Sequence, residues 1–164
     1  MADISTDPRI DPRIKAVMAA MPALAPEDVG SRDELLAMFS DSGLLKRRQE
    51  MEAMFDLIDN EQVAPSAGLD ISTHEFVSSP DGNTIKVQFI RPQTEERLPC
   101  VYYIPGGGMQ FMSCFLAMYR AWGKVIAAQG VAVAMVDFRN CLVPSSAPEV
   151  APFPAGLNDC VAGV

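Results

Sequence analysis

The spacing of hydrophobic residues along the chain changes near residue 65. Before that position, apolar residues recur every three or four positions, whereas after it they alternate with polar residues or form continuous runs. The first pattern predicts amphipathic helices and the second predicts β-strands. We therefore expect a helical segment over residues 1–65, a linker with the sequence VAPSAGL at 63–69, and an α/β domain over residues 66–164.

Two short helices are predicted first. Asp11 stands directly before Pro12, which is typical of an N-cap followed by proline in the first turn. This helix is expected to stop by Pro22, because proline cannot continue a helix. Ser31 and Glu34 have the spacing of a capping box and predict the start of a second helix.

A third helix is predicted over residues 44–62. Five residues at helical spacing form one face of it, four of them apolar: Leu44, Arg48, Met51, Phe55 and Ile58. Methionine is frequent in the whole helical segment and makes an adaptable apolar surface: Met18, Met21, Met38, Met51 and Met54. This surface has two interpretations, ordinary core packing or a flexible cover over an apolar binding site.

A β-hairpin is predicted at the start of the second part. Residues 74–79 and 84–91 have the composition of strands, and the sequence PDGN at 80–83 between them is a strong turn signal. Apolar residues alternate along the second strand: Ile85, Val87 and Phe89. This strand is therefore expected to have one buried face.

A βαβ unit is predicted after the hairpin. Residues 98–104 and 131–138 are continuous apolar runs, typical of central strands that are covered on both faces. Residues 115–129 between them predict a helix that ends at Gly130, so the sheet is expected to be mostly parallel. A last helix is expected from Pro154 with no strand after it, and we therefore expect the chain to be part of a longer protein.

Three consecutive glycines, Gly106, Gly107 and Gly108, follow the first of these apolar runs within the sequence YYIPGGGMQ. A phosphate-binding loop would need GxGxxG or GxxxxGK[ST], and neither pattern is present. An oxyanion hole needs backbone N–H groups that reach a developing negative oxygen, and glycines supply the bare backbone and the unusual φ values. The alternative is a tight turn after a buried strand.

Three motifs occur in a fixed order in the second part: YYIPGGGM at 102–109, VDFRN at 136–140 and PFPAGLNDC at 152–160. Together they resemble the hormone-sensitive-lipase-like family of α/β-hydrolase esterases, and the brefeldin A esterase-like branch in particular. The resemblance covers about residues 65–164, and the DPRIKAVM segment is similar to the family's helical cap. It implies an α/β-hydrolase fold, with an N-terminal helical cap (1–65) and the first strands of a mostly parallel central sheet in the N-terminal part of the catalytic domain (66–164).

The resemblance also implies roles for single residues. The N–H groups of Gly107 and Gly108 would face the oxyanion, while Gly106 would shape the loop and, with Met109, contact the substrate. Three polar residues match positions that brace neighbouring loops: Asp137, Arg139 and Glu149.

Two features depart from the family pattern. Pro105 stands where the family has a histidine that anchors the glycine loop, so this loop must be held differently, since proline offers no donor. The segment CLVPSSAPEVA at 141–151 is also longer than the corresponding link in many members.

The catalytic serine motif GxSxG is absent from these residues, and the one histidine, His74, lies in an early predicted strand. The resemblance therefore implies a carboxylesterase whose serine, histidine and acid lie outside this sequence, with this chain supplying the oxyanion loop and the cap. No metal or organic cofactor is implied. The alternative is a non-catalytic binding module that keeps the fold but lacks the triad.

The composition indicates which classes of partner to expect. The net charge is −8, from 13 basic and 21 acidic residues, which argues against nucleic acid and anionic membranes. The four cysteines have no CxxC spacing, so we expect free buried thiols in a cytoplasmic protein. The expected partners are a small-molecule ester and the remaining C-terminal part of the same protein, and a homodimer is a further candidate.

Overall fold

The computed structural model describes residues 6–20 and 29–164, which divide into two compact units, 1–34 and 35–164. Helix α1 (Pro12–Ala20) lies in the first unit. Its N-cap is the predicted one, because Asp11 Oδ1 accepts a hydrogen bond from the Arg13 N–H at 2.8 Å. The expected stop at Pro22 lies outside the described residues, as does Met21.

Helix α2 (Arg32–Phe39) begins with half of the predicted capping box. The Ser31 hydroxyl accepts from the Glu34 N–H at 3.2 Å, as expected. The Glu34 carboxylate accepts from the Gly30 N–H at 3.0 Å.

Helix α3 (Ser42–Asp56) ends six residues before the predicted limit. Asp41 caps its start by accepting from the N–H groups of Gly43 and Leu44. Beyond the helix, the Asn60 amide donates to the Leu57 carbonyl at 2.7 Å and forms a turn, so the prediction of helix to residue 62 is wrong.

The predicted apolar face of α3 is only partly covered. Met51 and Phe55 are half-buried, whereas Leu44 is 37% exposed and Ile58, beyond the helix end, is 42% exposed. The assignment of residues 1–65 as a cap distinct from 66–164 stays a prediction.

An ion cluster joins the segment after α3 to helix α4 (Ala117–Ala127). The Asp59 carboxylate pairs with Lys124, at 2.5 Å, and with Arg120. Burial acts to raise the pKa of Asp59, but the hydrogen bonds from Lys124 and Arg120 outweigh it and hold that pKa below its usual value. Asp59 and Lys124 are almost fully buried, so this cluster fixes the end of the helical segment to the sheet domain.

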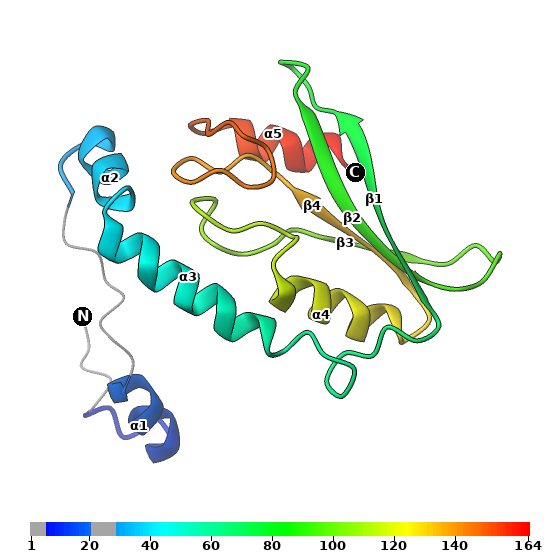
Figure 1. The fold of residues 1–164 in the computed structure, drawn as a ribbon, viewed down its shortest axis with the longest axis horizontal. Coiled ribbons are helices and arrows are strands. Elements are labelled where there is room, and N and C mark those ends of the chain that lie inside the picture. Colours follow the sequence, from blue (N-terminus) through cyan, green and yellow to red (C-terminus); the bar gives the residue numbers. More distant parts are fainter. Residues whose placement is uncertain (1–5, 21–28) are drawn as a thin grey trace. The chain divides into compact units, whose positions relative to one another are not determined.

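Four strands form one sheet in the order β1-β2-β4-β3 (Figure 1). Strands β1 (Leu69–Val77) and β2 (Thr84–Pro92) form the predicted hairpin, which begins five residues earlier than expected. Strands β3 (Cys100–Tyr103) and β4 (Ala132–Asp137) are parallel, which confirms the βαβ unit. Strand β2 pairs antiparallel with β4, so these four strands form a mixed sheet rather than the mostly parallel one expected.

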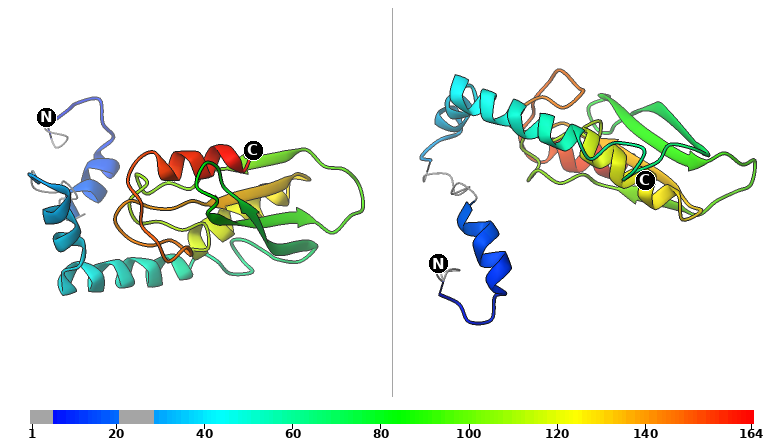
Figure 2. Two further views of the ribbon diagram at one scale, coloured as in Figure 1. Left: turned by 90° about the horizontal axis from the view of Figure 1, so that it is seen from above. Right: turned by 60° about the horizontal axis from the view of Figure 1, so that its bottom comes forward.

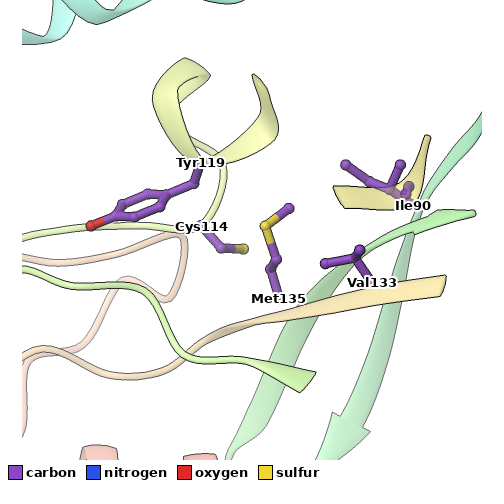
Figure 3. Packing of buried hydrophobic residues seen from close by; sticks show 6 residues of the cluster. Ile90, Cys114, Tyr119, Val133 and Met135 are labelled. Carbon is purple, nitrogen blue, oxygen red and sulfur yellow. The ribbon is translucent and has the colours of Figure 1, made fainter. Parts of the chain in front are cut away.

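Helices α4 and α5 (Ala155–Ala162) cover opposite faces of this sheet (Figure 2). Strand β4 supplies both cores, because alternate residues point to opposite faces. Val133 and Met135 pack with the α4 side, where Tyr119 is also buried (Figure 3). Val136 packs on the α5 side with Cys160.

Burial along the strands differs from two expectations. In β2 the side chains of Ile85 and Ile90 are both fully buried, so this strand is covered on both faces and the prediction of a single buried face is wrong. Strand β4 is central and buried, as predicted. The run at 98–104 instead forms the edge strand β3, where Val101 is 37% exposed, because only β4 pairs with it among the described strands.

The four cysteines are free thiols, as expected, but they are not all buried. Cys114 and Cys160 are buried and Cys141 is half-buried, whereas Cys100 is exposed at the start of the edge strand. Among the described helices, none is both long enough and apolar enough to cross a bilayer.

We expect Cys114 and Cys160 to resist alkylation in the native protein. Burial raises the pKa of Cys160 to about 11 and raises the pKa of Cys114 as well, so little reactive thiolate forms at mildly alkaline pH. Iodoacetamide labelling followed by mass spectrometry should leave both thiols unmodified until guanidinium chloride unfolds the protein. Rapid labelling of either thiol in the folded protein would contradict the packing of these cores.

Candidate active site

The glycine segment after β3 forms a tight turn with an uncommon backbone. Gly107, Gly108 and Met109 have φ angles of 107°, 61° and 58°, and Met109 is the one non-glycine residue with positive φ among the described residues. The Gln110 N–H donates to the Gly107 carbonyl at 3.0 Å. Positive φ at both central positions makes Gly107–Gln110 a type I′ turn.

The three glycines differ in what a side chain would meet. A Cβ at Gly107 would lie 2.6 Å from Met112 Cβ and 3.2 Å from Met112 N, so a side chain is excluded there. A Cβ at Gly108 would meet nothing nearer than 3.7 Å, and one at Gly106 would lie 3.1 Å from the Tyr119 hydroxyl. The close approach of Met112 therefore requires glycine at 107 for steric reasons, and its φ requires it as well.

The N–H groups of Gly107 and Gly108 make no hydrogen bond to any group in the described part of the chain. The Gln110 N–H, in contrast, is used to close the turn. The loop thus presents two successive unpaired donors on a backbone that a turn holds in place. Preorganised donors of this kind are what the stabilisation of a developing oxyanion requires.

The segment after β4 holds the loop in place. The Cys141 N–H donates to the Met109 carbonyl and the Val143 N–H to the Gln110 carbonyl, both at 2.9 Å. These backbone hydrogen bonds give a physical account of how the loop is held when Pro105 replaces the family's histidine. The signal in the sequence was the unusual 141–151 segment, whose partner could not be read from the sequence.

Asp137 braces the loops at the ends of β3 and β4. Asp137 is 2% exposed, and its carboxylate accepts hydrogen bonds from the Cys114 N–H at 3.0 Å and the Ser146 N–H at 2.7 Å. It therefore joins the segment that follows the glycine loop to the one that follows β4, as the resemblance implied.

Arg139 braces the hairpin turn and α5. Its guanidinium contacts the fully buried Asp159 at 2.7 Å and the Asp81 carboxylate of the hairpin turn at 2.6 Å. The hydrogen bond from Arg139 lowers the pKa of Asp81. Glu149 is exposed and has no hydrogen bond within the described residues, so its expected bracing role is wrong in this structure.

His74 lies far from the glycine loop in the sheet order, since β1 and β3 form its opposite edges. Its ring is exposed, with Nε2 3.0 Å from the Ser72 hydroxyl and an edge contact to Phe89. An open hollow of about 740 Å³ beside His74 is lined by Phe115 and Ser146 among others, but by none of the loop glycines. His74 is therefore not part of the candidate site, as the sequence predicted.

One contact beside the loop was not predicted. The ring of Phe39, at the end of α2, lies 6.0 Å from that of Phe111, directly after the turn. The helical segment thus reaches the glycine loop with an aromatic side chain.

The known proteins that this chain resembles are named as esterases. No family model matches the chain. The chain is 57% identical to esterase Est22. The TM-score is 0.89 for one Est22 structure and 0.88 for that of a serine-to-alanine mutant. The match covers 98% of this chain and 47% of the Est22 chain. It is 30% identical to brefeldin A esterase, a bacterial homologue of human hormone-sensitive lipase, with a TM-score of 0.67 over 96% of this chain and 43% of that one.

A curated relative is Gut esterase 1 of Caenorhabditis elegans, 34% identical over 65 residues, which are 40% of this chain and 12% of that protein. A bacterial heroin esterase, at 22% identity and a TM-score of 0.65, shares the fold. The chain therefore has the architecture of the N-terminal part of an α/β-hydrolase. Its resemblance to the hormone-sensitive-lipase-like esterases is confirmed, and it spans just under half the length of the Est22 chain.

Proposed function

We propose that this chain is the oxyanion-loop portion of a serine carboxylesterase. The observation that carries the proposal is the type I′ turn at Gly107–Gln110, with unpaired N–H groups at Gly107 and Gly108, in a chain 57% identical to Est22. The serine, histidine and acid of the triad lie outside these 164 residues. One Est22 structure contains p-nitrophenol, which is the alcohol released from p-nitrophenyl esters.

In this proposal, the serine attacks the ester carbonyl while the histidine takes its proton, and a tetrahedral oxyanion forms. The N–H groups of Gly107 and Gly108 donate to that oxygen. Gly106 shapes the approach of the chain to the turn, and Met109 contacts the substrate beside it. The oxyanion then collapses, the bond to the alcohol breaks as the histidine protonates it, and an acyl-serine remains. Water attacks the acyl-serine carbonyl while the histidine takes its proton, and the serine regains that proton as the acid is released.

The C-terminal part of the same protein is the proposed partner of the free edge of β3. Apolar side chains are exposed on and near this edge and on α5: Val101, Ile104, Leu157 and Val161. Covering them with further strands and helices would remove apolar surface from water.

We also propose a cytoplasmic location, supported by the free cysteines, and a homodimer remains a prediction.

We expect the full-length protein to hydrolyse p-nitrophenyl butyrate and residues 1–164 alone to leave it intact, because the nucleophile and base are missing. Release of p-nitrophenol measures both, with mass spectrometry to exclude traces of full-length protein. A folded full-length protein without activity would favour the non-catalytic binding module. Turnover by the short chain would place the nucleophile within these residues and contradict the proposal.

A further inference from the structure

Asn140 is a fully buried amide that contacts the glycine loop. It follows Arg139 at the end of β4 and has no exposed surface. Its side-chain Nδ2 donates a hydrogen bond of 2.7 Å to the Met112 carbonyl. Because only the amide nitrogen can donate to a carbonyl, this contact fixes the orientation of the side chain.

Met112 packs closely against the backbone of Gly107. Its Cβ and N lie 2.6 and 3.2 Å from the position that a Cβ on Gly107 would occupy, and its Cγ lies closer still. A shift of Met112 would therefore change the room available to the loop at its first positive-φ residue. The hydrogen bond from Asn140 fixes the position of the Met112 carbonyl. The neighbouring Cys141 N–H donates to the Met109 carbonyl on the other side of the turn.

The other half of the amide is unsatisfied. Asn140 Oδ1 is buried and has no hydrogen-bond partner among the described residues. A buried unpaired acceptor costs free energy, and an apolar side chain of similar size would avoid that cost. The amide therefore gains one hydrogen bond, to the Met112 carbonyl, at the cost of its own unpaired oxygen, and what it supplies to the loop is a fixed position for Met112.

We propose that Asn140 is a positioning residue for the oxyanion loop, acting through the Met112 carbonyl on the placement of Gly107. This role rests on the proposed esterase function. It predicts that removing the Asn140 amide misplaces the N–H groups of Gly107 and Gly108 and lowers the rate far more than the stability of the fold. Misplacement by about 1 Å costs on the order of a hundredfold in rate.

The test is Asn140→Leu in the full-length enzyme. We expect kcat for p-nitrophenyl butyrate to fall roughly tenfold to hundredfold, while KM stays within about twofold. The thermal midpoint should change little, because the variant removes the buried unpaired Oδ1 but also leaves the Met112 carbonyl without its donor. The inhibition constant of a trifluoromethyl ketone, whose serine adduct carries an oxyanion, should rise by the same factor as kcat falls.

Gln88→Leu is the matched control. Gln88 is also a buried amide with an unpaired carbonyl oxygen, and it lies on β2 with no hydrogen bond to the loop in the described residues. Its replacement should leave kcat and the inhibition constant unchanged. An equal loss of kcat in both variants would overturn the role of Asn140.

The remaining outcomes separate the two proposals. A wild-type enzyme without esterase activity would overturn the proposed function and this role with it. An active wild type with unchanged kcat in Asn140→Leu would overturn the role of Asn140 alone. Asn140→Ala is the second variant, because it removes the donor without adding volume, and failure of both variants to fold would show a structural role and overturn the proposal.

Discussion

Replacing Gly107 by alanine should lower kcat of the full-length esterase by roughly 10²–10³, the effect of losing one oxyanion donor. Its φ of 107° is strained for any residue with a Cβ, and that Cβ would lie 2.6 Å from Met112 Cβ. The turn must therefore move, and the Gly107 N–H moves with it.

Gly108→Ala is the matched control for this prediction. Gly108 also has positive φ, 61°, but a Cβ there would have open space, with the Gln110 side chain at 3.7 Å. The left-handed region costs an L-residue roughly 1–2 kcal/mol, and the N–H remains in place. We expect kcat within about tenfold of wild type, measured beside the thermal midpoint.

Two outcomes would contradict the oxyanion assignment. One is a well-folded Gly107→Ala enzyme with wild-type kcat, and the other is a larger loss of kcat in Gly108→Ala than in Gly107→Ala. Gly108→Pro is less informative, because proline holds φ near −65° and would break the turn as well as delete the donor. Loss of kcat in that variant should therefore be accompanied by a lower thermal midpoint.

Local sequence signals predicted the elements whose causes are local. The hairpin follows from the PDGN turn and the alternation after it, and the βαβ unit follows from two apolar runs around a helix ended by Gly130. The end of α3 was missed because the Asn60 side chain competes with the helix for the backbone groups around it. The edge position of β3 was missed because an apolar run does not show which strands will lie beside it in the sheet.

The candidate site likewise has a part that local sequence predicted and a part that depends on contacts between distant residues. Three glycines after a strand predicted a bare-backbone loop, and positive φ at Gly107 and Gly108 agrees with that prediction. The groups that hold the loop could not be predicted, because Asn140 and Met112 are separated by 28 residues along the chain. Pro105 indicated that the usual anchor was replaced, but only the tertiary structure shows which segment replaces it.

Replacing Arg139 by methionine should cost about 3–5 kcal/mol of unfolding free energy, the usual effect of breaking a buried ion pair by removing one partner. Arg139 donates from Nε and Nη2 to Asp159, which is fully buried, at 2.9 and 2.7 Å. Without the guanidinium, the partners left to Asp159 among the described residues are the Ser78 hydroxyl and the Arg139 backbone N–H.

Asp81→Asn is the control within the same network. Asp81 also pairs with Arg139, but its side chain is 47% exposed and water replaces the lost contact. Urea unfolding of the full-length enzyme should therefore show a large fall in midpoint for Arg139→Met and a small one for Asp81→Asn. Equal midpoints for the two variants would mean that the buried Arg139–Asp159 pair does not join the hairpin turn, β4 and α5 as the structure shows. This pair holds the end of β4, and the segment after β4 is hydrogen-bonded to the glycine loop through Cys141 and Val143. A lower midpoint should therefore also bring an earlier loss of activity on heating.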